Sequence, residues 1–197
     1  YGPVGANTTG GLGTGTGAAI TVNSAFLSPI RVVTFMDEVK TASGIVQERA
    51  GGRAMPVKFE GNVTVAAGDT DSFFHDDVEL SGLVFDSQGS VTFGDNLLTE
   101  QVTLSSGPVT INTHGKDVTF NAPVKGAQDM TVASSGATTF NDTVGAGAAL
   151  SSLTTDAGGT TRFNGGAVTT TGDQTYNDAV VLGANLTLTG ADVTFAS

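Results

Sequence analysis

The stretch TTFNDTVGAGAALSSLTTDAGGTTRFN, from Thr138 to Asn164, begins and ends on nearly the same residues. Thr139-Phe140-Asn141 returns 23 positions later as Arg162-Phe163-Asn164, and the pair Phe120-Asn121 precedes the first copy by 20 positions. Repetition at an interval of about twenty residues is typical of a solenoid, in which each repeat stacks on its neighbours.

A second repeating unit, a threonine between two apolar residues, runs through most of the chain. It occurs at Ile20-Thr21-Val22, Val33-Thr34-Phe35, Val63-Thr64-Val65, Val91-Thr92-Phe93, Val102-Thr103-Leu104, Val109-Thr110-Ile111, Val118-Thr119-Phe120, Met130-Thr131-Val132, Leu186-Thr187-Leu188 and Val193-Thr194-Phe195. Each triplet has the pattern of a short strand, because successive side chains point to opposite faces and two apolar ones flank an outward threonine.

Alternate triplets are spaced more evenly than adjacent ones. The interval is 18 residues from Val91 to Val109 and 21 from Val109 to Met130. We interpret this spacing as two strands in each coil of about 20 residues, which predicts an all-β parallel solenoid of roughly eight or nine coils.

The repeat also makes local predictions. Phe140 and Phe163 should occupy equivalent places in successive coils, and Asn121, Asn141 and Asn164 should turn the same corner through hydrogen bonds to the backbone. Because the second interval is three residues longer than the first, an extra bulge or loop is expected between Gly145 and Gly159.

The composition agrees with this fold and excludes some functions. The chain of 197 residues has 28 glycines, 11 phenylalanines, no cysteine and no tryptophan, and its net charge is -11. Such a charge repels phosphate backbones, so we expect no nucleic-acid partner. No apolar run approaches the ~20 residues that span a bilayer, so we expect no membrane insertion.

The repeat pattern divides the chain into three parts. Residues 1–19 are rich in glycine and threonine and have the composition of an arm or linker. Residues 20–56 contain triplets, but the charged part from Met36 to Pro56 has none, and we expect it to be a cap or an insertion and a specialised contact surface. Residues 57–197 are predicted to be the solenoid repeats.

The last triplet ends close to the final residue, and no capping segment follows it. We therefore expect either that the chain belongs to a longer protein or that a partner covers this coil. In the second case Val193 and Phe195 are the candidate assembly residues, which would pair with the next molecule end to end.

One acidic segment is a candidate metal site. Oxygen ligands are concentrated in GDTDSFFHDDVEL, where the candidate calcium ligands are Asp69, Asp71, Asp76, Asp77 and Glu79, with His75 among them. Carboxylates this close suit calcium. The spacing does not match an EF-hand loop, so a solvated turn without any cofactor is the competing interpretation.

An enzyme acting on polysaccharides is a further alternative, because such a site needs paired carboxylates or calcium with a base. Asp76, Asp77 and Asp95 are possible carboxylates. Few cations follow Gly61, however, and the sequence reveals no exposed aromatic platform for sugar stacking. We therefore predict no catalysis.

The run from Thr138 to Gly190, with weaker similarity back to about Val57, resembles the repeats of filamentous-haemagglutinin-like exoproteins and autotransporter passenger domains of bacteria. The resemblance implies a right-handed parallel β-helix that is secreted to the cell surface as an adhesin, a matrix scaffold or a stalk. The partners it implies are the protein itself or a polysaccharide or protein of the cell surface or biofilm matrix.

Overall fold

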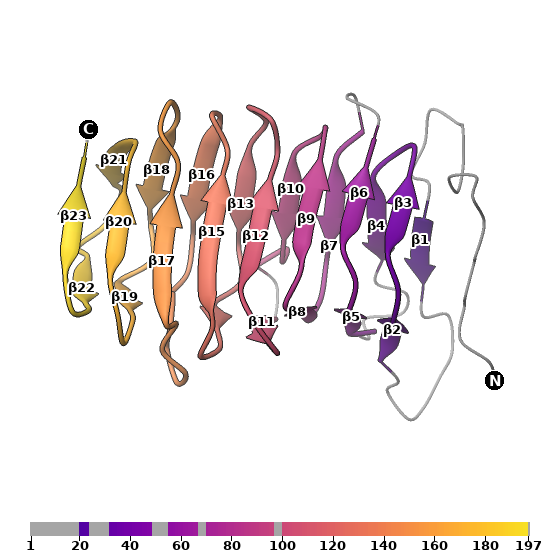
Figure 1. The fold of residues 1–197 in the computed structure, drawn as a ribbon, viewed down its shortest axis with the longest axis horizontal. Coiled ribbons are helices and arrows are strands. Elements are labelled where there is room, and N and C mark those ends of the chain that lie inside the picture. The colour runs from indigo at the N-terminus through magenta and orange to yellow at the C-terminus, as the bar shows by residue number, and fades with distance from the viewer. Residues whose placement is uncertain (1–19, 24–31, 49–54, 67–69, 97–99, 197) are drawn as a thin grey trace.

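The computed structural model describes residues 20–23, 32–48, 55–66, 70–96 and 100–196. In these ranges the chain forms 23 strands and no helix, and all strand pairs are parallel. The strands build a β-helix with three sheets along its length (Figure 1). Front strands in Figure 1 run upward, rear strands run downward and the chain advances from right to left, so the helix is right-handed.

Two of the sheets have eight strands each. Sheet A consists of β3 (Val39–Thr41), β6 (Val63–Val65), β9 (Val84–Ser87), β12 (Val109–Asn112), β15 (Asp129–Ala133), β17 (Ser152–Thr155), β20 (Gln174–Tyr176) and β23 (Val193–Phe195). Sheet B consists of β1 (Ile20–Asn23), β4 (Ile45–Glu48), β7 (Ser72–Phe74), β10 (Val91–Phe93), β13 (Val118–Phe120), β16 (Ala137–Phe140), β18 (Thr160–Phe163) and β21 (Ala179–Leu182).

The third face, sheet C, is made of shorter pieces. It consists of β2 (Val33–Phe35), β5 (Val57–Phe59), β8 (Val78–Ser81), β11 (Val102–Ser105), β14 (Val124–Lys125), the single bridging residue Val144, β19 (Ala167–Thr169) and β22 (Thr187–Thr189). Each coil therefore has three strands, and the expectation of two was wrong. β2 and β11 of this sheet do contain apolar-threonine-apolar triplets, but strands as short as β14 do not, so the triplet spacing did not reveal a third strand in every coil.

The predicted parallel solenoid is confirmed, with a different coil count. About seven turns of about 22 residues carry sheet A from Val39 to Val193. The expected eight or nine coils assumed about 20 residues per turn. The coils are longer on average because several corners carry additional residues, such as those between β12 and β13.

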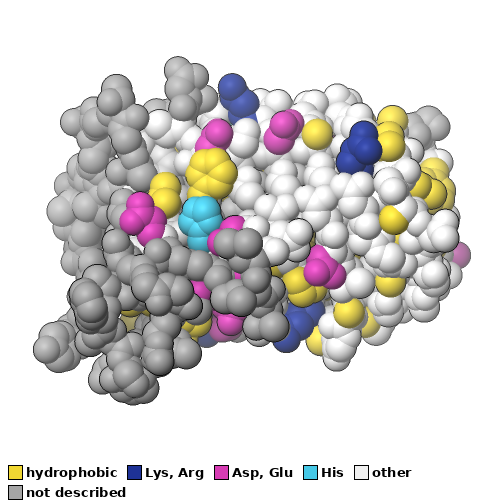
Figure 2. All heavy atoms as spheres, turned by 180° about the vertical axis from the view of Figure 1, so that it is seen from behind, with side chains coloured by type: hydrophobic (Ala, Val, Ile, Leu, Met, Phe, Trp, Pro, Cys, Tyr) yellow, Lys and Arg dark blue, Asp and Glu magenta, His cyan; other side chains and the backbone are white. Residues whose placement is uncertain are grey.

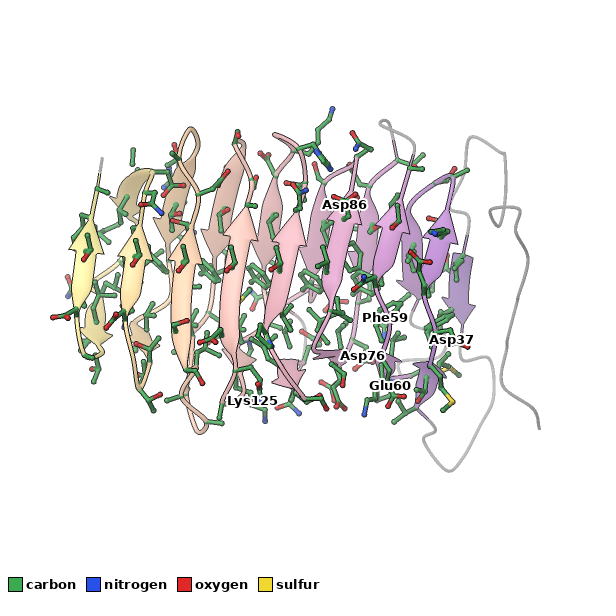
Figure 3. All side chains as sticks on the ribbon, in the orientation of Figure 1. Asp37, Phe59, Glu60, Asp76, Asp86 and Lys125 are labelled. Carbon is green, nitrogen blue, oxygen red and sulfur yellow. The ribbon has the colours of Figure 1, made fainter. Side chains whose placement is uncertain are left out.

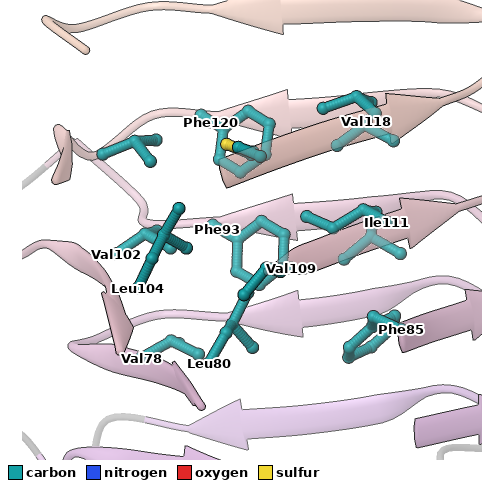
Figure 4. Packing of buried hydrophobic residues seen from close by; sticks show 14 of the residues in the cluster. Val78, Leu80, Phe85, Phe93, Val102, Leu104, Val109, Ile111, Val118 and Phe120 are labelled. Atoms are coloured by element: carbon teal, nitrogen blue, oxygen red, sulfur yellow. The ribbon is translucent and has the colours of Figure 1, made fainter. Parts of the chain in front are cut away.

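The core is a column of like residues stacked on like (Figure 4). The rings of Phe74, Phe93, Phe120, Phe140 and Phe163 follow one another at centroid distances of 4.9–5.2 Å, with adjacent planes within 11°. This spacing matches the strand separation of about 4.8 Å, so the backbone ladder itself sets the stacking distance. On sheet C, valines stack in the same way at Val57, Val78, Val102 and Val124.

The corner asparagines form a ladder between coils. Asn164 Nδ2 donates to Asn141 Oδ1 at 2.6 Å, and Asn141 Nδ2 donates to Asn121 Oδ1 at 2.7 Å. Only the last step, from Asn121 Nδ2 to the carbonyl of Gly94 at 2.9 Å, reaches the backbone. The expectation of local backbone caps was wrong, because equivalent residues of adjacent coils lie close enough for their amides to pair directly.

The additional residues of the longer interval lie where the sequence predicts them. Val144 pairs with Val124, and Ser152 pairs with Asp129. Five positions separate Val124 from Asp129, whereas eight separate Val144 from Ser152, so three extra residues lie in the corner between Val144 and Ser152. Beyond this corner, Phe163 pairs with Phe140 as expected.

The segment from Met36 to Pro56 is not a cap in its described part. β3 belongs to sheet A and β4 to sheet B, and both pair in parallel with the following coil. Lys40 points outward from β3, where its Nζ lies 2.8 Å from Glu38. The predicted boundary at Val57 is therefore not a boundary of the solenoid. Residues 49–54, and the predicted arm at 1–19, lie outside the described residues.

Candidate functional site

The acidic segment is divided by a strand rather than gathered in a loop. Asp71 precedes β7, and Asp76 and Asp77 follow it. Four residues of largely extended chain, Ser72 to His75, lie between Asp71 and Asp76, which places the two on the order of 15 Å apart. Asp71 instead caps the next coil, because its Oδ1 accepts a hydrogen bond from the Ser90 amide at 2.9 Å.

Asp76 and Asp77 lie at the corner between β7 and β8, and Asp76 is near the lower edge of the coils in Figure 3. Asp76 is buried, its Oδ1 accepts from the Asp77 amide at 2.7 Å, and its own amide donates to Gln47 Oε1 at 3.0 Å. Asp77 Oδ1 accepts from the Gln101 amide at 2.9 Å. Together these bonds tie three consecutive coils at one corner.

The environment of this corner changes the acidity of Asp77. Burial raises its pKa, and the hydrogen bond from the Gln101 backbone partly opposes the rise. The negative charge of Asp76 adds to the rise, whereas Lys125 works against it. Asp76 Oδ2 is buried and has no hydrogen-bond partner in the described part of the chain.

Glu79 faces outward from sheet C, away from the corner. Its Oε1 accepts from Ser105 Oγ at 2.6 Å and lies 3.2 Å from Lys58 Nζ, which is also 2.9 Å from Glu60. The hydrogen bonds to Glu60 and Glu79 raise the pKa of Lys58. Glu79 is thus part of a polar ladder across the coils.

The four candidate calcium ligands in the described ranges are consequently not brought to one place. Asp71, Asp76 with Asp77, and Glu79 occupy three separate positions with their own hydrogen bonds. Over the described ranges, no group of three or more His, Cys, Asp or Glu side chains is arranged to hold a metal ion. Asp69 lies outside the described residues, and calcium binding stays an untested prediction.

A different cluster appears on the outer face of β7. The outward row of sheet B runs through Val46, Phe73, Thr92, Thr119, Thr139 and Arg162. Phe73 is 39% exposed, and its ring stacks on the ring of His75 with centroids 6.2 Å apart and planes 11° apart. His75 Nδ1 lies 3.6 Å from Asp95 Oδ2 of the next coil. We call these three residues the Phe73 cluster.

The Phe73 cluster puts a partly exposed aromatic ring on the surface of sheet B, where the sequence had suggested none. Figure 2 shows this face, where a histidine lies beside an exposed hydrophobic side chain among acidic residues. A signal was present, since Ser72-Phe73-Phe74 has phenylalanine at the position where other strands carry threonine. The neighbouring Asp95 belongs to a different coil, so only the fold brings it to His75.

Sheet A carries a more regular surface. Its register aligns Val84, Thr110, Thr131, Thr154, Thr175 and Thr194 in one outward row. Beside this row, near the upper end of β9 in Figure 3, Asp86 Oδ1 lies 2.7 Å from His114 Nε2 and accepts from Asn112 Nδ2 at 2.8 Å. The face is therefore a ladder of hydroxyl and amide groups.

The predicted assembly residues lie in the last described coil. Val193 is 37% exposed and Phe195 is 53% exposed, although both follow the inward positions of sheet A. Phe195 stacks on Tyr176 at 5.3 Å, and Leu182 of the same coil is 58% exposed. This coil presents apolar core positions that no further strand covers in the described chain.

Comparison of the chain with protein-family models, with curated proteins and with solved structures finds no match. Across the described ranges, no helix has the length and apolar character needed to cross a membrane.

Proposed function

We propose that the chain is a non-catalytic structural and adhesive module of a bacterial surface or matrix protein, which is exported and displayed outside the cell. The sequence resemblance to filamentous-haemagglutinin-like exoproteins and autotransporter passenger domains points in this direction. The module would act as a stiff spacer whose side walls contact polysaccharides or proteins of the surface.

The observation that carries this proposal is the uninterrupted column of stacked core residues. Five phenylalanines from β7 to β18 stack without a break, and the asparagine ladder follows them at the corner. Dense stacking resists bending, because each coil is packed against both neighbours. Seven coils at about 4.8 Å span roughly 34 Å, which suits a segment of a longer stalk.

The side walls support the adhesive part of the proposal. The threonine row of sheet A repeats one hydroxyl per coil, and hydroxyl groups both donate and accept hydrogen bonds. Repeated weak contacts add up when several are made together. Such a surface suits an extended polymer better than a small molecule.

Surface labelling tests the proposed location. An antibody raised against this chain is expected to label intact cells of its source and the surrounding matrix. A cytoplasmic protein of the same cells, probed in parallel, should be labelled only after permeabilisation. Labelling of this chain only after permeabilisation would contradict the proposal.

Activity measurements test the non-catalytic part. We expect no turnover of pectin-like or alginate-like polymers, with or without calcium. Turnover that disappears in Asp76→Asn or Asp77→Asn would instead establish the alternative of a polysaccharide-active enzyme.

The exposed last coil favours a second candidate function, a subunit that assembles end to end. Val193 and Phe195 offer apolar surface, and β23 is an edge strand of sheet A. Uncovered parallel edges recruit further strands, and head-to-tail contacts of this kind propagate into filaments. A second copy stacked on this coil would extend all three sheets.

Light scattering and negative-stain microscopy test the assembly. The wild-type chain should form threads, whereas Phe195→Asp should remain monomeric because it places a charge in the contact. Thr110→Asp, on the side wall, is the matched control and should still assemble. A wild-type chain that stays monomeric at high concentration would exclude this candidate.

A further inference from the structure

We infer that the Phe73 cluster is a carbohydrate-binding platform for neutral or amino sugars, and that it does not take uronic acids. The inference deepens the adhesive role proposed above and rests on it. Phe73, His75 and Asp95 supply the aromatic face and the hydrogen-bonding group that recognition of a pyranose ring requires.

The first step concerns the place of Phe73 in its row. Register puts it where the next three coils carry Thr92, Thr119 and Thr139. The inward neighbour Phe74 already fills the core of this coil, so an outward phenylalanine is not needed for packing. Exposed single apolar residues are common, and a site therefore needs more than exposure.

The second step is the geometry around the ring. The ring planes of Phe73 and His75 are nearly parallel, 11° apart with centroids 6.2 Å apart, so His75 stacks beside Phe73 and holds its ring in place on β7. Val46 adjoins Phe73 on the preceding coil and is half-buried, which widens the apolar surface. Ligand sites combine such aromatic surface with a few polar groups that orient the ligand. The apolar face of a pyranose can stack on the exposed part of the Phe73 ring.

The third step is the polar group at its edge. Asp95 comes from the next coil, lies 3.6 Å from His75 and is itself half-buried. A carboxylate held beside an aromatic surface accepts hydrogen bonds from sugar hydroxyl groups or from an ammonium group. An amino sugar gains further from its positive charge above the Phe73 ring.

The surrounding charge selects among sugars. Asp71 is exposed two residues before Phe73, and Glu48 follows Gln47, the residue that pairs with Phe74 on the preceding coil. The cation of this row, Arg162, lies four coils away. Acidic side chains repel a carboxylate, so uronic acids are disfavoured, and the net charge of -11 acts in the same direction.

The threonine row gives the bound polymer a direction. Thr92, Thr119 and Thr139 continue from Phe73 along the axis at one residue per coil, about 4.8 Å apart. A polysaccharide anchored at Phe73 and laid along this row meets one hydroxyl group per coil. The contacts along the row are individually weak and add to the anchor.

Isothermal titration calorimetry with three hexasaccharides tests the inference. The probes are cellohexaose, which is neutral, a glucosamine hexamer, which is cationic, and a galacturonic acid hexamer, which is anionic. We expect the first two to bind the wild-type chain and the third to give no heat. Phe73→Thr, which restores the residue of the row, should weaken binding about tenfold or more, as loss of an aromatic contact does.

A matched control separates the platform from general surface chemistry. Val32→Thr changes another exposed apolar residue, 55% exposed, just before β2 of sheet C and outside both threonine rows. It should leave all affinities within about twofold. Asp95→Asn should weaken the glucosamine hexamer more than cellohexaose, because only the former is cationic. Circular dichroism of each variant confirms that the fold is retained.

The outcomes are distinguishable. Equal binding by Phe73→Thr and wild type, or preference for the galacturonic acid hexamer, overturns the platform while leaving an adhesive role elsewhere on the surface. Failure of the wild-type chain to bind any of the three sugars also overturns the platform, whereas the proposed surface role is decided separately by antibody labelling of intact cells. A loss of mass on gel filtration in Phe73→Thr would show instead that the ring docks against a second copy, which also overturns the inference.

Discussion

The rings of Phe120 and Phe140, which are 20 positions apart in the chain, lie with centroids 4.9 Å apart and planes within 5° of each other. Both are fully buried, and each also stacks on the equivalent ring of the coil beyond. The stacking interval equals the spacing of the strands, so ring contacts and backbone hydrogen bonds reinforce each other.

The stack predicts a large effect of one truncation. Phe120→Ala removes a ring that contacts two others and leaves a cavity, so we expect a loss of about 3–5 kcal/mol in the free energy of unfolding. Phe73→Ala, on the outer face, is the matched control and should cost no more than about 0.5 kcal/mol. Urea denaturation measures both. Similar losses for the two variants would mean that the stack does not hold the coils together.

The asparagine ladder predicts graded losses. Asn141 makes two amide bonds and Asn164 makes one in the ladder, so Asn141→Ala should cost about twice as much as Asn164→Ala, at about 1 kcal/mol for each bond. Asn141→Asp should also destabilise, because a carboxylate cannot donate to Asn121. Thermal unfolding of the three variants gives the order, and a tolerated Asn141→Asp would argue against the amide assignment.

The corner that holds the three extra residues contains a matched pair of glycines. Gly145 has φ of +79° and Gly147 has φ of +77°, a region that costs an L-residue about 1–2 kcal/mol. A Cβ on Gly145 would also overlap the carbonyl oxygen of Thr169, whereas one on Gly147 meets nothing within 4 Å. Gly147→Ala should therefore lower the free energy of unfolding only by this conformational cost, and Gly145→Ala should lower it clearly more. Equal losses would indicate that the corner relaxes around the methyl group.

The corner carboxylate Asp77 predicts a pH dependence of stability. Its pKa is raised above the ordinary 3.8, so the folded chain binds this proton more tightly than the unfolded chain does. The stability due to Asp77 is present below pH 3.8 and is lost as pH rises through the raised pKa. Asp77→Asn removes this loss of stability and keeps a side-chain oxygen that accepts a hydrogen bond from the Gln101 amide.

The difference in melting temperature, variant minus wild type, should therefore be larger at pH 7 than at pH 3. Because Asp77 is only half-buried, we expect a change of about 1–3 °C. Asp77→Ala is the control, since it loses the acceptor of the Gln101 amide and should be less stable than Asp77→Asn at both values of pH. A difference that shrinks toward pH 7 would mean that folding lowers the pKa of Asp77 instead of raising it.

The separation of the acidic side chains predicts the response to calcium. Asp71, Asp77 and Glu79 accept hydrogen bonds at three different places, so millimolar calcium should leave the melting temperature within the error of the measurement. Magnesium at the same concentration controls for ionic strength. A rise with calcium alone, abolished by Asp71→Asn, would restore the metal site suggested by the sequence.

Several features of the fold could be predicted from the sequence, because each depends on the local alternation of apolar and polar residues and on the interval between equivalent positions. The pairing of Phe140 with Phe163, and the three extra residues before Ser152, follow from counting along the chain. The third strand of each coil could not be predicted throughout sheet C, since its strand β14 has only two residues and Val144 contributes a single bridging residue. Nor does Met36 to Pro56 contain a triplet, although β3 and β4 are ordinary coil strands.

The repeat pattern is enough to predict that the chain stacks in coils, because a period of about twenty residues leaves parallel stacking as the way to bury every apolar triplet. Which side chains share a surface depends on the three-dimensional fold. It divided the acidic segment at β7, since Asp71 and Asp76 stand at opposite ends of a strand. It also placed Asp95 beside His75 and Phe73, because coils bring together residues that are about 20 positions apart.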